Sequence, residues 1–188
     1  MKMTQRMYDA VNTVAILHNG QYRKDKVTPF ITHPFFVGMV LSRYTDDEDV
    51  VIAGLFHDVL EDVPGQTRDH IASGFGDRIA DIVVGVTHNT EIDWKTSRTD
   101  YLDMLRSGSE ESLMVACADK IHNITSHIEG VRKGGEQFWS YFSAPKQEYK
   151  WFYESTLSIA QDRLKNPIVD ELRGVVQRAN EEIFAPSE

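Results

Sequence analysis

The sequence predicts an all-α fold, and three observations support this prediction. Apolar residues recur at helical spacing along nearly the whole chain. Alternating strands joined by hairpin turns are missing from the pattern. Prolines and glycines stand where helices would begin and end. We therefore expect helices over residues 4–19, 34–44, 47–62, 67–74, 77–86, 96–106, 109–132, 145–164 and 167–184.

Different sequence signals predict the first five helices. The N-terminal stretch has charges placed through an apolar pattern, which is typical of an amphipathic helix rather than of a signal peptide. Pro34 suits a first helical position and opens the second helix. The third contains the apolar run VVIAGLF, and glycines 74 and 76 separate the fourth from the fifth.

The remaining helices follow a polar segment. HNTEIDWKTSRT, residues 88–99, is weakly periodic and is the best candidate for a mobile loop, so the next helix is expected only from residue 96. The run SLMVACADKIHNI predicts a long, largely buried helix over 109–132. Pro145 and Pro167 suit the first positions of the last two helices, and Asn166 suits the N-cap before Pro167.

Composition excludes several classes of protein. The chain has 188 residues with 41% apolar and 26% charged side chains, as ordinary globular proteins do. No apolar run approaches the roughly 20 residues that cross a bilayer, so no membrane association is expected. A lone Cys117 excludes a disulfide framework within the chain and suits a reducing cytoplasm. We expect one domain over 1–188, located in the cytoplasm, with an oligomeric state that the sequence leaves unknown.

The charge pattern points away from nucleic acid. A formal net charge of −9 argues against non-specific binding to a polyanion. A small anionic ligand needs only a local cluster of cations or a metal. The basic residues do cluster, although each cluster also fits an ordinary solvated face; the clusters are Arg23, Lys24 and Lys26, then Lys95 and Arg98, then Lys146 and Lys150.

The stretch HDVLED, residues 57–62, concentrates charge at the end of a buried run. Buried carboxylates are costly unless they are paired or bound to a metal. On one continuous helix, His57 would share a face with Glu61, and Asp58 would share a face with Glu61 and Asp62. An isolated His-Asp pair also occurs for structural reasons, so the pair needs support from elsewhere in the chain.

That support comes from two other segments. His33, in PFITHPFF, is surrounded by apolar residues; it is either a core histidine satisfied by a backbone carbonyl or a ligand. Asp119 follows an almost wholly apolar helical run, so it needs a cation or a metal nearby, and Asn123 lies one turn further on the same face. Two imidazoles and two carboxylates form a mixed site that divalent Mn, Fe or Zn accepts.

These blocks together resemble the HD superfamily of metal-dependent phosphohydrolases. The resemblance is greatest to the hydrolase domain of the RelA/SpoT family, especially its small stand-alone members that degrade the alarmone (p)ppGpp. It covers about residues 10–130 in order: HNGQYRKDKVTPFITHP, GLFHDVLED, FGDRIADIVVGVT and ACADKIHNI. FWSYFSAPKQEYKWFYES is similar to the C-terminal part of single-domain bacterial members.

The resemblance implies a fold, a reaction and a metal. The fold is a compact multi-helix HD-domain bundle, with core motifs at about 10–130 and C-terminal helices at 145–184. The reaction is removal of the 3′-pyrophosphate from guanosine tetra- or pentaphosphate, leaving GDP or GTP. The metal is Mn²⁺, with Fe²⁺ or Zn²⁺ as alternatives. By motif position its ligands are His33, His57, Asp58 and Asp119.

The resemblance also implies roles around the metal. Glu61 and Asp62 are the catalytic pair that acts on the attacking water, and Asn123 contacts the nucleotide. Arg23 and Lys24 match a basic pair that lines the nucleoside pocket, where an arginine can stack on a base and a lysine can meet phosphate. Candidates for the remaining phosphates and the base are Lys95, Arg98, Lys146, Tyr149 and Tyr153.

Two alternatives remain open. An HD nucleotidase could cleave an ordinary 5′-phosphate, although Glu61-Asp62 and Arg23-Lys24 favour the alarmone. A catalytically inert HD domain could bind nucleotide only, although that requires a lost ligand and none is missing. With no room in the chain for a synthetase domain, alarmone synthesis is not expected.

Overall fold

A computed structural model describes residues 4–185 and confirms the all-α class. Within these residues the only β-type pairing is an isolated bridge between Tyr22 and Pro29. The helices are α1 Gln5–Leu17, α2 Thr32–Leu41, α3 Glu48–Phe56, α4 Val59–Asp62, α5 Arg68–Phe75, α6 Asp77–Val84, α7 Trp94–Ser107, α8 Glu110–Gly134, the 3-10 helix η1 Gly135–Tyr141, α9 Lys146–Arg163 and α10 Ile168–Glu182.

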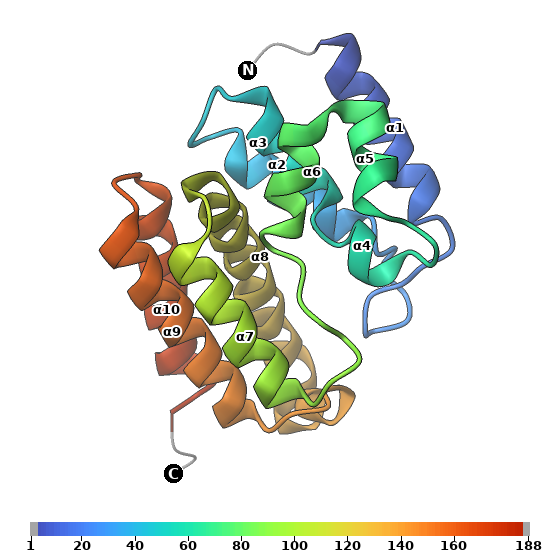
Figure 1. The fold of residues 1–188 in the computed structure, drawn as a ribbon. Coiled ribbons are helices and arrows are strands. Elements are labelled where there is room, and N and C mark those ends of the chain that lie inside the picture. The colour runs from blue at the N-terminus through green and yellow to red at the C-terminus, as the bar shows by residue number, and fades with distance from the viewer. Residues whose placement is uncertain (1–3, 186–188) are drawn as a thin grey trace.

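Helix α8 joins two groups of helices (Figure 1). It packs on α2, α3 and α6 on one side, and on α9 and α10 on the other. In Figure 1 the helices α1 to α6 lie in the upper part, and α7, α9 and α10 run beside α8 in the lower part. No helix of the described residues is both long enough and apolar enough to cross a membrane.

Several starts of helices agree with the sequence analysis. Thr4 caps α1 by accepting a hydrogen bond from the Met7 backbone, and Ser109 caps α8 in the same way through Ser112. Asn166 accepts a bond from the Ile168 backbone at 3.0 Å, as expected of a capping side chain. The prolines are displaced from the expected positions: α2 begins before Pro34, while α9 and α10 begin directly after their prolines.

The prediction of one continuous helix over residues 47–62 is wrong. Helix α3 ends at Phe56, and α4 is a single turn that begins at Val59. The His57 imidazole binds the Gly54 carbonyl, one of the carbonyls that the last turn of α3 leaves open. Asp58 lies at φ −92° and ψ −5°, a sparsely populated backbone region where active-site residues often occur. The HDVLED stretch is therefore a break at His57 and Asp58 followed by the single helical turn α4.

The predicted loop over 88–99 is shorter than expected. Asp93 caps α7 through the Thr96 backbone, so helix begins at Trp94, two residues before the expected start. The short helix η1 was not expected, because the glycines at 134 and 135 suggested only a joint.

Candidate functional site

Close packing of α2 on α3 brings His33 and His57 together. A Cβ atom at Gly38 would lie 2.8 Å from a Leu55 methyl carbon, and one at Gly54 would collide with Leu41. Glycine at both positions lets the two backbones approach. His33, on α2, then places its Nε2 atom 3.1 Å from Nε2 of His57. Both imidazoles are almost fully buried.

Hydrogen bonds on the far side of each ring orient the two imidazoles. His57 donates from Nδ1 to the Gly54 carbonyl at 2.8 Å, which leaves Nε2 as a lone pair. His33 Nδ1 lies 2.7 Å from Nδ1 of His122, whose ring stacks on that of His33. Burial lowers the pKa of His122 to about 3, so its ring is neutral near pH 7. The two Nε2 atoms face one another at 3.1 Å, an arrangement that a proton or a metal between them stabilises.

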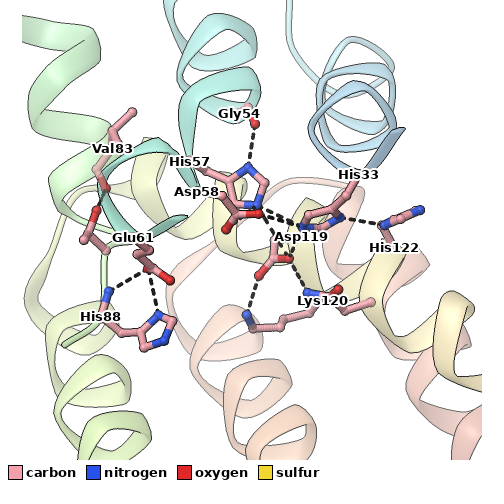
Figure 2. Close-up of polar contacts among 12 residues, drawn as sticks. His33, Gly54, His57, Asp58, Glu61, Val83, His88, Asp119, Lys120 and His122 are labelled. Carbon is pink, nitrogen blue, oxygen red and sulfur yellow. Dashed lines mark hydrogen bonds and ion pairs between the residues drawn. The ribbon is translucent and has the colours of Figure 1, made fainter. Parts of the chain in front are cut away.

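Asp58, from the turn after α3, and Asp119, from α8, complete this cluster (Figure 2). Asp58 places one oxygen 3.2 Å from His57 Nε2 and the other 3.3 Å from His33 Nε2. Asp119 Oδ1 lies 3.2 Å from His33 Nε2 and 3.8 Å from His57 Nε2. We call these four residues the ligand cluster; the structure brings together all four predicted metal ligands.

The ligand cluster has an excess of negative charge. Burial raises the pKa of both carboxyls, but neighbouring imidazoles and Lys120 outweigh burial and hold the pKa of Asp58 and Asp119 below the ordinary range. Burial lowers the pKa of His57, while Asp58 and Asp119 raise it by more, to about 9. The cluster therefore attracts a positive charge, which a divalent ion can supply in place of a proton.

The spacing of these atoms fits a metal. Ligand atoms held at about 2.1 Å from one ion, at octahedral or tetrahedral angles, lie about 3.0–3.4 Å apart. The four shortest separations, 3.1–3.3 Å, fall in this range. His33, His57 and Asp58 offer atoms that all lie within 4.8 Å of one another; Asp119 reaches both imidazoles without joining that mutual set. Two neutral nitrogens and two carboxylates suit Mn, Fe or Zn.

The remaining bonds of Asp119 orient it. Its Oδ2 atom pairs with the buried Lys120 ammonium, which also lies over the Tyr101 and Phe152 rings. Its Oδ1 atom accepts a hydrogen bond from Asn123 Nδ2. The Asn123 carbonyl oxygen in turn accepts from Arg23 at 3.2 Å. The predicted residue Asn123 thus connects a cluster carboxylate to the predicted basic pair.

The two predicted catalytic carboxylates occupy different surroundings. The expectation that Glu61 shares a helical face with His57 is wrong, because the chain turns between them. Glu61 instead points to His88, which contacts Oε1 through both its backbone and its ring (Figure 2). Burial, with the charges of Asp58 and Glu61, raises the pKa of Asp62 to about 7. Asp62 can therefore exchange a proton near neutral pH.

A cavity of about 660 Å³ opens beside the ligand cluster. Arg23, Lys24, His122 and Asn123 lie in its wall, so three of the predicted substrate residues share it. Lys24 donates to the Tyr141 carbonyl at 3.3 Å and lies over the Phe142 ring. The wall is otherwise rich in aromatic rings, namely Tyr22, Phe30, Phe36, Phe138, Tyr141 and Phe142. Cations and ring faces together suit a phosphorylated base.

The other predicted substrate residues lie on α7 and α9, outside this wall. Lys95 pairs with Glu148 at 2.5 Å and lies over the Trp151 ring, while Lys146 pairs with Glu136 at 2.8 Å. Tyr153 is buried, and its hydroxyl lies 2.9 Å from His127 Nδ1. Arg98 lies over the Trp94 and Phe152 rings, and Tyr149 packs among Trp94, His127, Trp139 and Phe142.

Sequence reasoning missed two histidines that contact the site. His122 stands directly before Asn123 in ADKIHN, so its place within a motif was available as a signal, although nothing there indicated contact with His33. His88 opens the polar segment that was read as a loop, and nothing in its surroundings pointed to Glu61.

Comparison with known proteins places the chain. The family model described as HD domain matches residues 10–139. The guanosine-3′,5′-bis(diphosphate) 3′-pyrophosphohydrolase MESH1 of Danio rerio is 32% identical over 124 residues, which are 64% of this chain and 68% of that protein. The pyrophosphohydrolase of the same name from Borreliella burgdorferi is 32% identical over 126 residues, 64% of this chain. The match spans only 19% of that longer protein.

Two solved structures share the fold. The crystal structure of lmo0812 from Listeria monocytogenes is 31% identical, covers 79% of this chain and 99% of its own, and has a TM-score of 0.72. A metazoan orthologue of SpoT, described as hydrolysing ppGpp, has a TM-score of 0.79 over 95% of this chain and 97% of its own; at 20% identity it supports the fold alone. The chain belongs to the HD domain family and, within it, groups with the guanosine-3′,5′-bis(diphosphate) 3′-pyrophosphohydrolases.

Proposed function

We propose that this protein is a divalent-metal-dependent hydrolase that removes the 3′-pyrophosphate from (p)ppGpp. The observation that carries the proposal is the ligand cluster, built from three separate segments next to a cavity lined by cations and aromatic rings. The names of the relatives from Danio rerio and Borreliella burgdorferi support the choice of substrate. The products would be pyrophosphate and GDP or GTP with a free 3′-hydroxyl group.

The metal ligands would be His33, His57, Asp58 and Asp119, and we propose Mn²⁺ as the ion. When bound, such an ion supplies Lewis acidity that makes a water molecule nucleophilic near neutral pH and offsets charge on the phosphate. The Gly54 carbonyl and His122 would keep the Nε2 atoms of His57 and His33 directed at the ion. Lys120 would keep one oxygen of Asp119 occupied, so that the other faces the site.

Glu61 and Asp62 would divide the proton transfers. Hydrolysis takes one proton from water and gives one to the departing 3′ oxygen. Asp62, whose pKa is raised to about 7 by burial, Asp58 and Glu61, can hold a proton at neutral pH and release it. Glu61, fixed by His88, would accept hydrogen bonds from the attacking water.

The cavity would hold the nucleotide. Arg23 would stack on the base or meet phosphate, Lys24 would contact phosphate, and Asn123 would meet the ribose side of the nucleotide. Roles for Lys95, Arg98, Lys146, Tyr149 and Tyr153 stay predictions, since these residues do not line the wall of the cavity. We also propose that residues 1–188 work as one domain, in the cytoplasm, with a small-molecule nucleotide as their ligand.

The test is a substrate panel on chelated protein with metals added back one at a time. The panel contains ppGpp, pppGpp, GMP, a 3′-phosphorylated nucleotide and a generic phosphate ester, each with Mn²⁺, Fe²⁺ or Zn²⁺. We expect ppGpp with Mn²⁺ to be turned over fastest, with release of pyrophosphate. Faster cleavage of GMP would favour an HD nucleotidase. Binding of ppGpp without turnover under any metal would favour a non-catalytic binding domain.

A further inference from the structure

His88 lies between α6 and α7 and makes two contacts to one oxygen of Glu61. Its backbone N–H donates to Oε1 at 2.8 Å, and its ring Nδ1 lies 2.7 Å from the same atom. We propose that His88 is a positioning residue, which fixes the Glu61 carboxylate so that its second oxygen faces the reacting water. This inference rests on the proposed function and deepens it.

Because Glu61 is buried, the stability and orientation of its carboxylate depend on the polar groups that contact it. Its side chain is 8% exposed, and a buried carboxylate without donors is strongly disfavoured. Among the described residues, His88 makes the two polar contacts to this carboxylate: its backbone N–H donates to Oε1, and its ring Nδ1 lies at ion-pair distance from the same atom. Two contacts to one oxygen restrict rotation of the carboxylate and leave Oε2 to accept a proton or a hydrogen bond. A single donor would allow Glu61 to turn between positions.

His88 itself is held from both sides. The preceding residue, Thr87, donates its hydroxyl to the Val83 carbonyl at 2.8 Å, at the end of α6. The following residue, Asn89, accepts a bond on its carbonyl from the Ser97 hydroxyl at 2.6 Å, at the start of α7. The His88 ring meets the buried Tyr101 ring edge to face, with centroids 6.2 Å apart. The segment around His88 is thus anchored to α6 and α7, and the ring packs on α7, so His88 can hold Glu61 in one position.

The direct test compares His88→Ala with His88→Asn. Alanine removes the ring donor and keeps the backbone donor, whereas the asparagine amide can place an N–H group close to the position of Nδ1. We expect His88→Ala to lower kcat about 10- to 100-fold, the loss typical of one bond to a charged group, with KM changed less than about threefold. We expect His88→Asn to recover most of that loss. Thr90→Ala, an exposed change in the same segment, is the matched control.

A second arm shows whether His88 acts through Glu61. In a Glu61→Gln background, adding His88→Ala should lower kcat less than about threefold, because the residue that His88 positions no longer takes protons. Equal losses in both backgrounds would overturn the proposal. So would loss of bound Mn²⁺ from His88→Ala, measured by elemental analysis, because that would place His88 in the support of the metal.

The kinetics use whichever nucleotide the panel identifies as the best substrate. If that nucleotide is not ppGpp, the proposed substrate fails while the comparison of His88 variants still decides the positioning role. A protein that hydrolyses none of the nucleotides overturns both proposals.

Discussion

The ligand cluster and the cations of α7 and α9 differ in how deeply their charged side chains are buried and in what compensates the charge. His33 and His57 are 2% and 4% exposed, and each faces the other and the carboxylates of Asp58 and Asp119. Lys95 has a side chain that is 48% exposed, and it pairs with Glu148 on the neighbouring helix. Buried charges stay only where partners or a metal compensate their desolvation, whereas exposed pairs contribute little. Burial is therefore the property that separates a site from a charged surface.

Asp58→Ala should produce the largest effect in this comparison. The carboxylate contacts both imidazoles, so its removal takes away a proposed metal ligand and part of the charge that would attract a cation. Loss of residues that merely support a ligand lowers affinity or activity about 10- to 100-fold. We expect more than 100-fold loss of turnover, together with loss of bound metal in elemental analysis. Unchanged metal content and turnover would show that the ligand cluster is not the metal site.

The pH dependence of the metal-free protein tests the charge of the ligand cluster. The folded-state pKa of His57, about 9, lies above its unfolded value of 6.5, because Asp58 and Asp119 outweigh the effect of burial. The stabilisation is complete below pH 6.5 and is lost as pH rises toward 9, up to about 3 kcal/mol. Denaturant unfolding of the chelated protein across this range measures it. Mn²⁺ should remove this pH dependence, and an identical slope with and without Mn²⁺ would contradict the exchange of proton for metal.

Arg23→Ala should have an intermediate effect. Arg23 lies in the wall of the cavity and bonds Asn123, but the metal ligands do not depend on it directly. We expect KM for ppGpp to rise about tenfold, as for one charge-assisted bond to substrate, with metal content unchanged. Steady-state kinetics with Arg23→Lys as the matched variant separates charge from planar stacking. An unchanged KM in Arg23→Ala would remove this residue from the substrate contacts.

Lys95→Ala should have the smallest effect. Its ammonium is already paired with Glu148 and lies over the Trp151 ring, outside the cavity wall. We expect kcat and KM to stay within about twofold of the parent protein, since exposed pairs are weak. A rise in KM like that of Arg23→Ala would instead extend the substrate site to α7, as the sequence alone suggested.

The fold class and the ligand cluster were predictable because burial leaves a signal in the sequence. Asp119 stands in an apolar run, and His57 and Asp58 follow another. Each position therefore predicts a buried charged group that needs a partner of opposite charge or a metal. The helices were predictable for the same reason, since apolar spacing sets the buried face. The resemblance of the ordered motifs to the HD superfamily associated these four residues as one ligand set, and the structure brings His33, His57, Asp58 and Asp119 within a few ångströms of one another.

The break after Phe56 and the partner of Glu61 were not predictable in this way. Helical spacing assumes that a helix continues, and only the bond between His57 and the Gly54 carbonyl reveals that it does not. His88 and His122 depend on contacts between segments that carry no sequence pattern of their own. The cations on α7 and α9 were assigned to the substrate from composition and position in the chain. The direction in which a surface cation points depends on tertiary packing, which composition does not reveal.

The side-chain amide of Asn123 links the ligand cluster to the wall of the cavity. Its nitrogen donates to Asp119 of the ligand cluster, and its oxygen accepts from Arg23 in the cavity wall. A nucleotide that bound the same N–H group of Arg23 would compete with its bond to Asn123, and an ion that engaged Asp119 Oδ1 would act on the other end of the same amide. If nucleotide changes the affinity for metal by some factor, metal must change the affinity for nucleotide by that same factor. One side-chain amide would thus couple the affinities of the proposed metal and the proposed substrate.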